Sequence, residues 1–205
     1  DAVDGALDLP DAALDRGEVF WVDRLNPPDA EVAEAGEHFG LHPLSIEDSQ
    51  HFGQRPKLDD YPDSVLLVFY GARSGADGLP EPVETHLYIT ARAIVTVRRD
   101  DLPGVTEACR RMRERTITTS EAALYGVLHA LTDSFIEPLR AVDAELDRLE
   151  DQALDDPEPE LRRRLLEIKH SLLVLRQVVE PQRDLMASRR QVIADLPGFT
   201  DDSTH

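Results

Sequence analysis

The chain has 205 residues and a formal net charge of −19, because 41 aspartates and glutamates outnumber 22 lysines and arginines. A surface this acidic repels nucleic acid and anionic lipid headgroups and attracts cations, so we expect no nucleic-acid partner. The acidic excess also has a simpler explanation, in solubility or in adaptation to salt. The single cysteine, Cys109, excludes an internal disulfide framework. With 41% hydrophobic residues, the chain can form one large domain or two small ones.

Residues 1–117 are predicted to form a mixed α/β domain. Alternating apolar residues predict a strand at 18–23, and a continuous apolar run predicts a buried strand at 64–70. The other expected elements are a helix at 29–39, a solvent-exposed loop at 71–82 where Gly and Pro recur, a strand hairpin at 83–90 and 93–98, and a helix at 103–115. These elements predict a mixed β-sheet with helices on its faces.

A short helix that begins near Pro43 carries two adjacent carboxylates, Glu47 and Asp48, close to its C-terminal end. Proline suits the first turn of a helix, because its missing N–H would have no partner there. The negative end of the helix macrodipole disfavours acidic side chains, so a bound cation would stabilise this pair. After the helix, the chain is expected to turn at Gly53 and to become extended near Leu58.

Beyond this domain the pattern changes, and residues 118–196 are predicted to form a long antiparallel helical hairpin. Apolar residues recur at spacings of three and four along both arms, as in a helix–helix seam. The first arm is expected to be one helix over 120–154, ended by the prolines of the segment 155–160. Pro138 and Pro181 lie inside the two helical patterns, and each should remove one backbone hydrogen bond and bend its helix.

The two arms of this hairpin carry opposite charge. Residues 133–151 contain seven acidic residues and two arginines, whereas residues 161–190 contain eight basic and three acidic residues. One interpretation is that the arms attract each other along their flanks, with each exposed pair contributing less than ~1 kcal/mol. The alternative is that one charged face docks on a neighbouring subunit.

Several short motifs follow one another along most of the chain. In order, they are WVDRLNP at 21–27, FGLHPL at 39–44 with IED at 46–48, QRPK at 54–57, VTVRR at 95–99, LY at 124–125, LDRLE at 146–150 and PQRD at 181–184. Together they resemble the cytoplasmic part of the CorA family of divalent-cation transporters, which includes the ZntB-type zinc transporters. The resemblance covers roughly residues 18–196.

This resemblance implies a domain of a magnesium and cobalt ion transporter rather than an enzyme. Family members are homopentamers of the cell (inner) membrane, with a large cytoplasmic funnel and C-terminal transmembrane helices. A GMN signature at the pore mouth selects the ion, and neither this signature nor an apolar run long enough to cross a bilayer occurs in the chain. Residues 197–205 are therefore expected to be a truncated linker to a missing stalk and missing transmembrane helices. The domain would lie on the cytoplasmic side of the membrane.

The resemblance also implies a regulatory metal site. In the family, the acidic pair that matches Glu47 and Asp48 faces a carboxylate on the stalk helix of a neighbouring subunit, and a divalent ion bridges them. Mg²⁺ fits such a site, because it prefers oxygen ligands and is commonly held by one or two carboxylates. The bound ion would favour the closed pore, and its loss would let the subunits separate.

His129 is a second candidate ligand, because it matches an acidic position on the first long helix of some family members. An imidazole there would favour Zn²⁺, Co²⁺ or Ni²⁺ over Mg²⁺ and would support a ZntB-type zinc transporter. The alternative role of His129 is that of a polar residue partly packed between helices. Near the acidic pair, Arg55 and Lys57 are expected to pair with neighbouring acids such as Asp59 or Asp60.

Two other functions fit only part of the sequence. A metal-dependent hydrolase would use Glu47 and Asp48, but the sequence has no nucleophile motif, no His-rich ligand set and no glycine loop that would hold a phosphate. A non-transport helical interaction scaffold would account for the helical hairpin but not for the N-terminal motifs. The sequence therefore favours the sensor domain of a metal ion transporter.

Overall fold

The computed structural model describes residues 19–49, 51–91, 93–113, 119–155, 159–196 and 199 of the chain. Its strands are β1 (Phe20–Leu25), β2 (Lys57–Tyr61), β3 (Ser64–Ser74), β4 (Pro80–Thr90) and β5 (Ala93–Arg98). They form one sheet in the order β1-β5-β4-β3-β2. β1 runs parallel to β5 and all other neighbours are antiparallel, so the predicted mixed sheet is confirmed.

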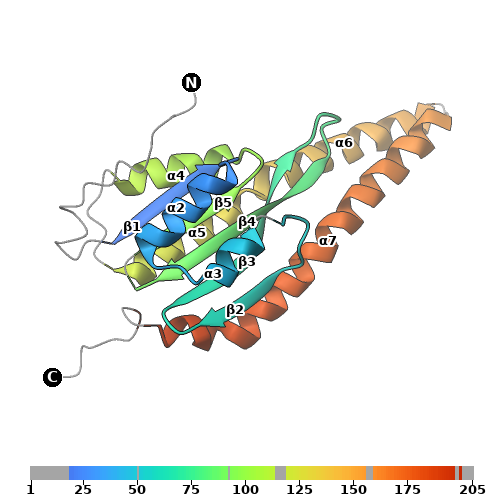
Figure 1. Cartoon of the computed structure of the whole chain (residues 1–205). Coiled ribbons are helices and arrows are strands. Elements are labelled where there is room, and N and C mark those ends of the chain that lie inside the picture. The colour runs from blue at the N-terminus through green and yellow to red at the C-terminus, as the bar shows by residue number, and fades with distance from the viewer. Residues whose placement is uncertain are drawn as a thin grey trace.

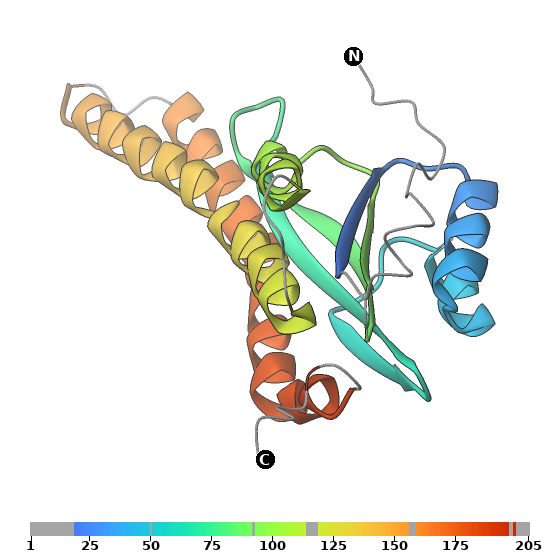
Figure 2. The same ribbon diagram turned by 90° about the vertical axis from the view of Figure 1, so that its left-hand side faces the viewer.

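Helices cover both faces of this sheet. They are α2 (Asp29–Phe39), α3 (Pro43–Ser49), α4 (Pro103–Arg113), α5 (Ser120–Asp133), α6 (Ile136–Asp155) and α7 (Pro159–Ala194). One face carries α2 and α3, and the other carries α4, α5 and part of α7 (Figures 1 and 2). The far halves of α6 and α7 extend past the sheet as a helical pair. Among the helices of the described residues, none combines the length and the apolar character needed to cross a bilayer.

Each face of the sheet has its own apolar core. Side chains of successive strand residues point to opposite faces, so Leu66 and Leu67 of β3 belong to different cores. The larger core joins Leu67 to Val127 and Leu131 of α5, and the smaller core joins Leu66 to residues of α2 and its flanking turns. The sheet therefore separates the α2–α3 layer from the α4–α5–α7 layer.

The prediction of a solvent-exposed loop at 71–82 is wrong, because β3 and β4 continue through this segment as a long ribbon that pairs Ser74 with Pro80. Leu79, at the tip of this ribbon, is buried against the seam between α6 and α7. This tertiary packing outweighs the local preference of Gly and Pro for a loop. The prolines fit the strand, because β5 pairs with the C-terminal half of β4 and leaves the N-terminal half as an edge.

The prediction of a single helix over 120–154 is also wrong, since α5 and α6 are separate helices. The interruption lies one turn before Pro138. Proline has no N–H to donate to the carbonyl of Ser134, and in a regular helix its ring would clash with that carbonyl. The hydroxyl of Ser134 satisfies two backbone groups at the break. It donates to the Leu131 carbonyl at 2.5 Å and accepts from the N–H of Ala72 at 2.9 Å.

α6 and α7 pack as the expected antiparallel hairpin, while the tip at 156–158 lies outside the described residues. Val142, Leu149 and Ile168 are buried in the seam between the two helices. Nε of Arg164 in α7 lies 3.0 Å from Oε1 of Glu145 in α6, which supports the interpretation that the arms attract each other. α7 continues without a break through Pro181. The hairpin is thus part of the same packed unit as the sheet ribbon.

The WVD and VTVRR motifs lie side by side in β1 and β5 and share a buried ion pair. The guanidinium of Arg98, which is 1% exposed, donates from Nη2 to Oδ2 of Asp23 at 2.6 Å and from Nε to Oδ1 at 3.1 Å. Thr96 donates its hydroxyl to Asp23 at 2.7 Å and accepts from the indole N–H of Trp21 at 3.0 Å. Burial by itself lowers the pKa of Arg98, but the hydrogen bonds to Asp23 raise it above its ordinary value. These motifs therefore have a structural role.

Candidate metal-binding site

Glu47 and Asp48 lie in the last turns of α3, on the outer surface of the helical layer. α3 packs on α2 through Ile46, which approaches Gly36 so closely that a Cβ on Gly36 would lie 2.1 Å from Cδ1 of Ile46. Ser45 is buried on the same side. Because these residues face inward, the next two project outward: Glu47 is exposed, and the side chain of Asp48 is 41% exposed.

Lys57 neutralises one side of this acidic pair. Its Nζ lies 2.6 Å from Oδ2 of Asp48 and 2.7 Å from Oδ2 of Asp59. Burial by itself lowers the pKa of Lys57, but the two carboxylates together raise it by more. The pKa therefore lies above its ordinary value, and the ammonium stays charged. The expected pair with Asp59 is confirmed, and the contact with Asp48 is an addition that the sequence did not predict. In the described part of the chain, Glu47 has no ion pair.

The loop after α3 is held against the end of the helix by Gln54. The side-chain amide of Gln54 donates to the Asp48 carbonyl at 2.7 Å and to the His51 carbonyl at 2.6 Å. The last carbonyls of a helix have no partner within it, so this amide satisfies acceptors at the C-terminal end of α3. Gly53 turns the chain there as expected, with a φ of 91° that favours glycine. This contact explains the glutamine of the QRPK motif.

The buried carboxylate of Glu84, in β4, anchors the same loop from the side of the sheet. It accepts from the N–H of Gly53 at 2.6 Å and from the N–H of Gln54 at 3.2 Å. It also accepts from the hydroxyl of Tyr70 at 3.1 Å and from Nε2 of His86 at 2.7 Å. Burial by itself raises the carboxyl pKa of Glu84, but the hydrogen bonds from His86 and the loop lower it below its ordinary value. Glu84 is therefore ionised at neutral pH.

Glu84 was not among the residues that the sequence singled out. A sequence signal exists, because Glu84 and His86 stand two residues apart in a segment that was expected to be a strand. In an antiparallel strand this spacing places both side chains on one face. Polar residues on a buried face must bind each other or a loop that covers them. Which loop this is depends on the tertiary structure.

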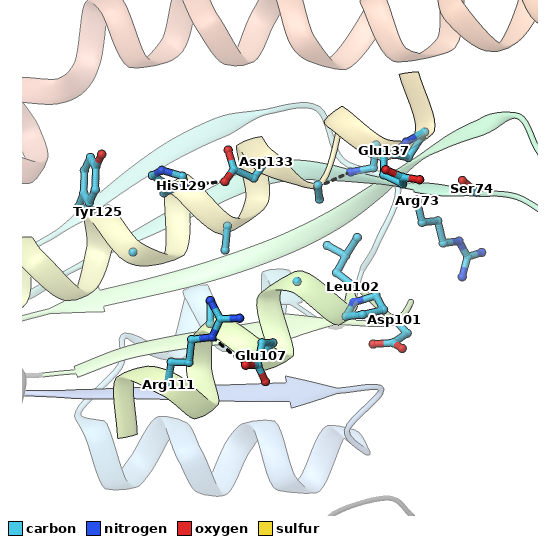
Figure 3. Close-up of a pocket in the computed structure, with 18 residues that line it drawn as sticks. Arg73, Ser74, Asp101, Leu102, Glu107, Arg111, Tyr125, His129, Asp133 and Glu137 are labelled. Atoms are coloured by element: carbon cyan, nitrogen blue, oxygen red, sulfur yellow. Dashed lines mark hydrogen bonds and ion pairs between the residues drawn. The ribbon is translucent and has the colours of Figure 1, made fainter. Parts of the chain in front are cut away.

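His129 lies in α5, on the rim of a cavity of about 860 Å³ that runs between α4 and α5 (Figure 3). Its Nδ1 is 2.9 Å from Oδ2 of Asp133, and its ring meets the ring of Tyr125 edge-on at 5.6 Å. The side chain of His129 is 51% exposed, so about half of it is covered by its neighbours. Across the cavity, Glu107 and Arg111 of α4 form their own ion pair.

The structure does not bring His129 to the acidic pair. α3 and α5 lie on opposite faces of the sheet, as Figure 2 shows. Among the described residues, no three His, Cys, Asp or Glu side chains are placed together so that they could hold a metal ion. Glu47 with Asp48, and His129 with Asp133, are thus two separate partial sets of ligands. Each needs further ligands, either water molecules or groups from another chain.

The family of the chain follows from a comparison with known proteins. Residues 16–204 match the family described as CorA-like Mg2+ transporter protein. The chain belongs to this family. The predicted resemblance is therefore confirmed, and the family is one of transporters rather than enzymes. The motifs described above all lie within the matched residues, in β1, α3 and the loop after it, β5 and the helices.

Two curated relatives carry names that refer to different metal ions. The cobalt/magnesium transport protein CorA of Thermotoga maritima is 29% identical over 178 residues, which cover 84% of this chain and 50% of the relative. The zinc transport protein ZntB of Klebsiella pneumoniae is 27% identical over 195 residues, which cover 94% of this chain and 58% of the relative. The chain thus spans about half the length of the curated relatives it matches.

Solved structures show that the fold is shared with CorA-like proteins. The complete structure of the CorA magnesium transporter from Methanocaldococcus jannaschii matches with a TM-score of 0.70 at 19% identity, over 82% of this chain and 54% of that one. The ZntB cytoplasmic domain from Vibrio parahaemolyticus matches with a TM-score of 0.58 at 15% identity, over 86% of this chain and 72% of that one.

Proposed function

We propose that this chain is the ion-sensing cytoplasmic domain of a homopentameric divalent metal ion transporter in the cell (inner) membrane. The rest of such a protein would supply a stalk helix and the transmembrane helices of the pore. Membership of the CorA-like family supports this role, and so does the greater length of the relatives. The observation that carries the proposal is the position of Glu47 and Asp48, whose carboxylates face solvent at the end of α3 where a second subunit can approach.

Mg²⁺ is the proposed regulatory ion, and its binding favours the closed pore. Glu47 and Asp48 offer carboxylate oxygens, and water and a carboxylate from the neighbouring subunit complete the six ligands that Mg²⁺ prefers. Without the ion, acidic groups from the two subunits repel each other. The ion therefore stabilises the arrangement in which the subunits are close, and this difference in affinity shifts the population toward it.

A ZntB-type zinc transporter domain is the second candidate, favoured by one observation. His129 and Asp133 present a ring nitrogen and a carboxylate on adjacent turns of α5, 2.9 Å apart. A metal ion would have to displace this contact and bind both groups, and an imidazole ligand suits Zn²⁺, Co²⁺ or Ni²⁺ better than Mg²⁺. Under this second candidate function, the regulatory ion is bound on the α5 side of the sheet.

Removing both carboxylates of the acidic pair is expected to abolish Mg²⁺-dependent protection of the full-length oligomer from proteolysis. A ligand that binds only the assembled state stabilises it in proportion to the logarithm of its concentration, and this term disappears with the site. The variant is Glu47→Ala with Asp48→Ala, and the measurement is the Mg²⁺ concentration that gives half-maximal protection. A matched control, Glu34→Ala with Glu37→Ala, removes the same charge from the exposed side of α2 and should retain the wild-type midpoint.

Equal protection of the acidic-pair variant and the unmutated protein would count against the proposed site. Repeating the titration with Mg²⁺, Zn²⁺, Co²⁺ and Ni²⁺ on a His129→Ala variant distinguishes the magnesium proposal from the zinc candidate. A higher Zn²⁺ midpoint with an unchanged Mg²⁺ midpoint in that variant would favour the zinc candidate. Unchanged midpoints for all four ions would remove His129 from the set of ligands.

Replacing Lys57 by methionine is expected to increase the affinity of the acidic pair for Mg²⁺. The ammonium of Lys57 lies 2.6 Å from Asp48 and would be close to a bound cation, which it repels. At a separation of ~6 Å in a water-like dielectric, this repulsion amounts to about 1 kcal/mol, so the Mg²⁺ midpoint should fall roughly fivefold. Lys57→Arg keeps the charge and should leave the midpoint unchanged. A higher midpoint in Lys57→Met would mean that Lys57 orients Asp48 instead of competing with the ion.

A further inference from the structure

We propose that Glu84 is a positioning residue for the acidic pair: its buried carboxylate holds the loop that fixes the last turn of α3, and this sets the affinity of Glu47 and Asp48 for a divalent cation. The inference rests on the proposed function, because it concerns the same site. Glu84 lies under the loop and is 9% exposed, and in the described part of the chain it does not come together with the acidic pair as a set of metal ligands. Its effect on the ion passes through the loop.

The first step is the anchor between Glu84 and the loop. A buried carboxylate is tolerated only where its charge is compensated by donors. Two of the donors to Glu84 are backbone N–H groups of the loop, those of Gly53 and Gln54, at 2.6 and 3.2 Å. Surface loops usually direct their backbone groups to water, whereas these two bind an ionised group inside the protein. The loop and the buried charge therefore stabilise each other.

The second step runs from Gln54 to the acidic pair. The backbone of Gln54 is held on both sides, because its N–H binds Glu84 and its carbonyl accepts from the hydroxyl of Tyr70. Its side chain then donates to the Asp48 carbonyl at 2.7 Å. The backbone of Asp48, at the end of α3, is thus held by a segment that Glu84 anchors.

The third step concerns the size of the effect. In metal sites, groups that orient a ligand without touching the ion typically change the affinity by 10–100-fold when they are removed. α3 has seven residues, and its packed residues Ser45 and Ile46 precede the acidic pair, so its last turn depends on contacts from outside the helix. Loss of the anchor would let the two carboxylates vary in position, and the ion would have to order them on binding.

The test is Glu84→Gln in the full-length protein, which keeps the size of the side chain and one acceptor oxygen but removes the charge. We expect the Mg²⁺ midpoint for protection from proteolysis to rise roughly tenfold. We also expect the backbone amides of residues 51–54 to exchange hydrogen faster. Glu81→Gln is the matched control, because Glu81 is an exposed acid on the same strand, and it should change neither quantity.

Tyr70→Phe provides a second variant in case the first does not fold. It removes the hydroxyl that donates to both Glu84 and Gln54 and should move both quantities in the same direction. An unchanged Mg²⁺ midpoint in folded variant protein would overturn the inference, even if the loop amides exchange faster, because Glu84 would then have a structural role alone. The proposed function fails on a different result, the retention of Mg²⁺ protection after removal of both Glu47 and Asp48. The two failures are therefore distinguishable.

Discussion

Replacing Asp23 by alanine is expected to lower the free energy of unfolding by about 3–5 kcal/mol, because it leaves a buried guanidinium without its partner. Arg98 is 1% exposed, and its Nε and Nη2 bind the two carboxylate oxygens of Asp23 at 3.1 and 2.6 Å. Its other nitrogen, Nη1, donates to the Asp100 carbonyl and to the exposed carboxylate of Asp101. These surface contacts do not replace the buried negative charge.

The same arginine supplies a matched control for this prediction. Asp101→Ala removes a carboxylate that also binds Arg98, but the side chain of Asp101 is 59% exposed. Exposed ion pairs contribute roughly 0–1 kcal/mol, so this variant should unfold almost as the unmutated protein does. The measurement is denaturant unfolding at neutral pH, followed by circular dichroism. A loss in Asp23→Ala no larger than that in Asp101→Ala would contradict the role assigned to the buried pair.

Replacing Gln182 by leucine is expected to lower the free energy of unfolding by about 2–4 kcal/mol, because two buried backbone groups would lose their partners. The side-chain oxygen of Gln182 accepts from the N–H of Tyr70 at 2.7 Å, and its amide donates to the Tyr70 carbonyl at 3.3 Å. β2 pairs with β3 up to Val68, so at Tyr70 the amide of Gln182 takes the place of the next strand. Leucine fills similar space but neither donates nor accepts.

Gln191→Leu is the control for this second prediction. Gln191 lies on the same helix, α7, is exposed, and its amide binds the neighbouring Asp195 at 2.8 Å. Its replacement should change the free energy of unfolding by less than ~0.5 kcal/mol. Faster hydrogen exchange of the Tyr70 amide in Gln182→Leu would show directly that the contact is lost. If the two variants unfold alike, the glutamine of the PQRD motif has no structural role in joining α7 to the sheet.

Local patterns were sufficient for the type and order of most elements. The apolar run at 64–70 lies in β3, the segments 83–90 and 93–98 pair as β4 and β5, and the spacing of apolar residues marks the seam between α6 and α7. These features depend on residues a few positions apart, which is the range over which periodicity acts. The same holds for the acidic pair, since a short helix from Pro43 is enough to place Glu47 and Asp48 at its end.

The extent of β3 and β4 and the break before α6 required the tertiary structure. Leu79 is buried only because the helical hairpin lies against the tip of the ribbon, and this contact holds strands through a segment rich in Gly and Pro. The break at Ser134 was not expected, although Pro138 was expected to disturb its helix. A proline disturbs the turn before it, and whether that turn bends or opens depends on available partners, here the N–H of Ala72 in β3.

The sequence by itself determined that this chain has an α/β sheet unit, a helical hairpin and an exposed acidic pair, and its motifs determined its family. Only the tertiary structure decided that Lys57 binds Asp48, that Glu84 anchors the loop after α3, and that His129 lies on the other side of the sheet from the acidic pair. The physical reason is distance along the chain. Glu84 meets Gly53 from 31 residues away, and such contacts depend on how strands and helices pack, which no local spacing contains.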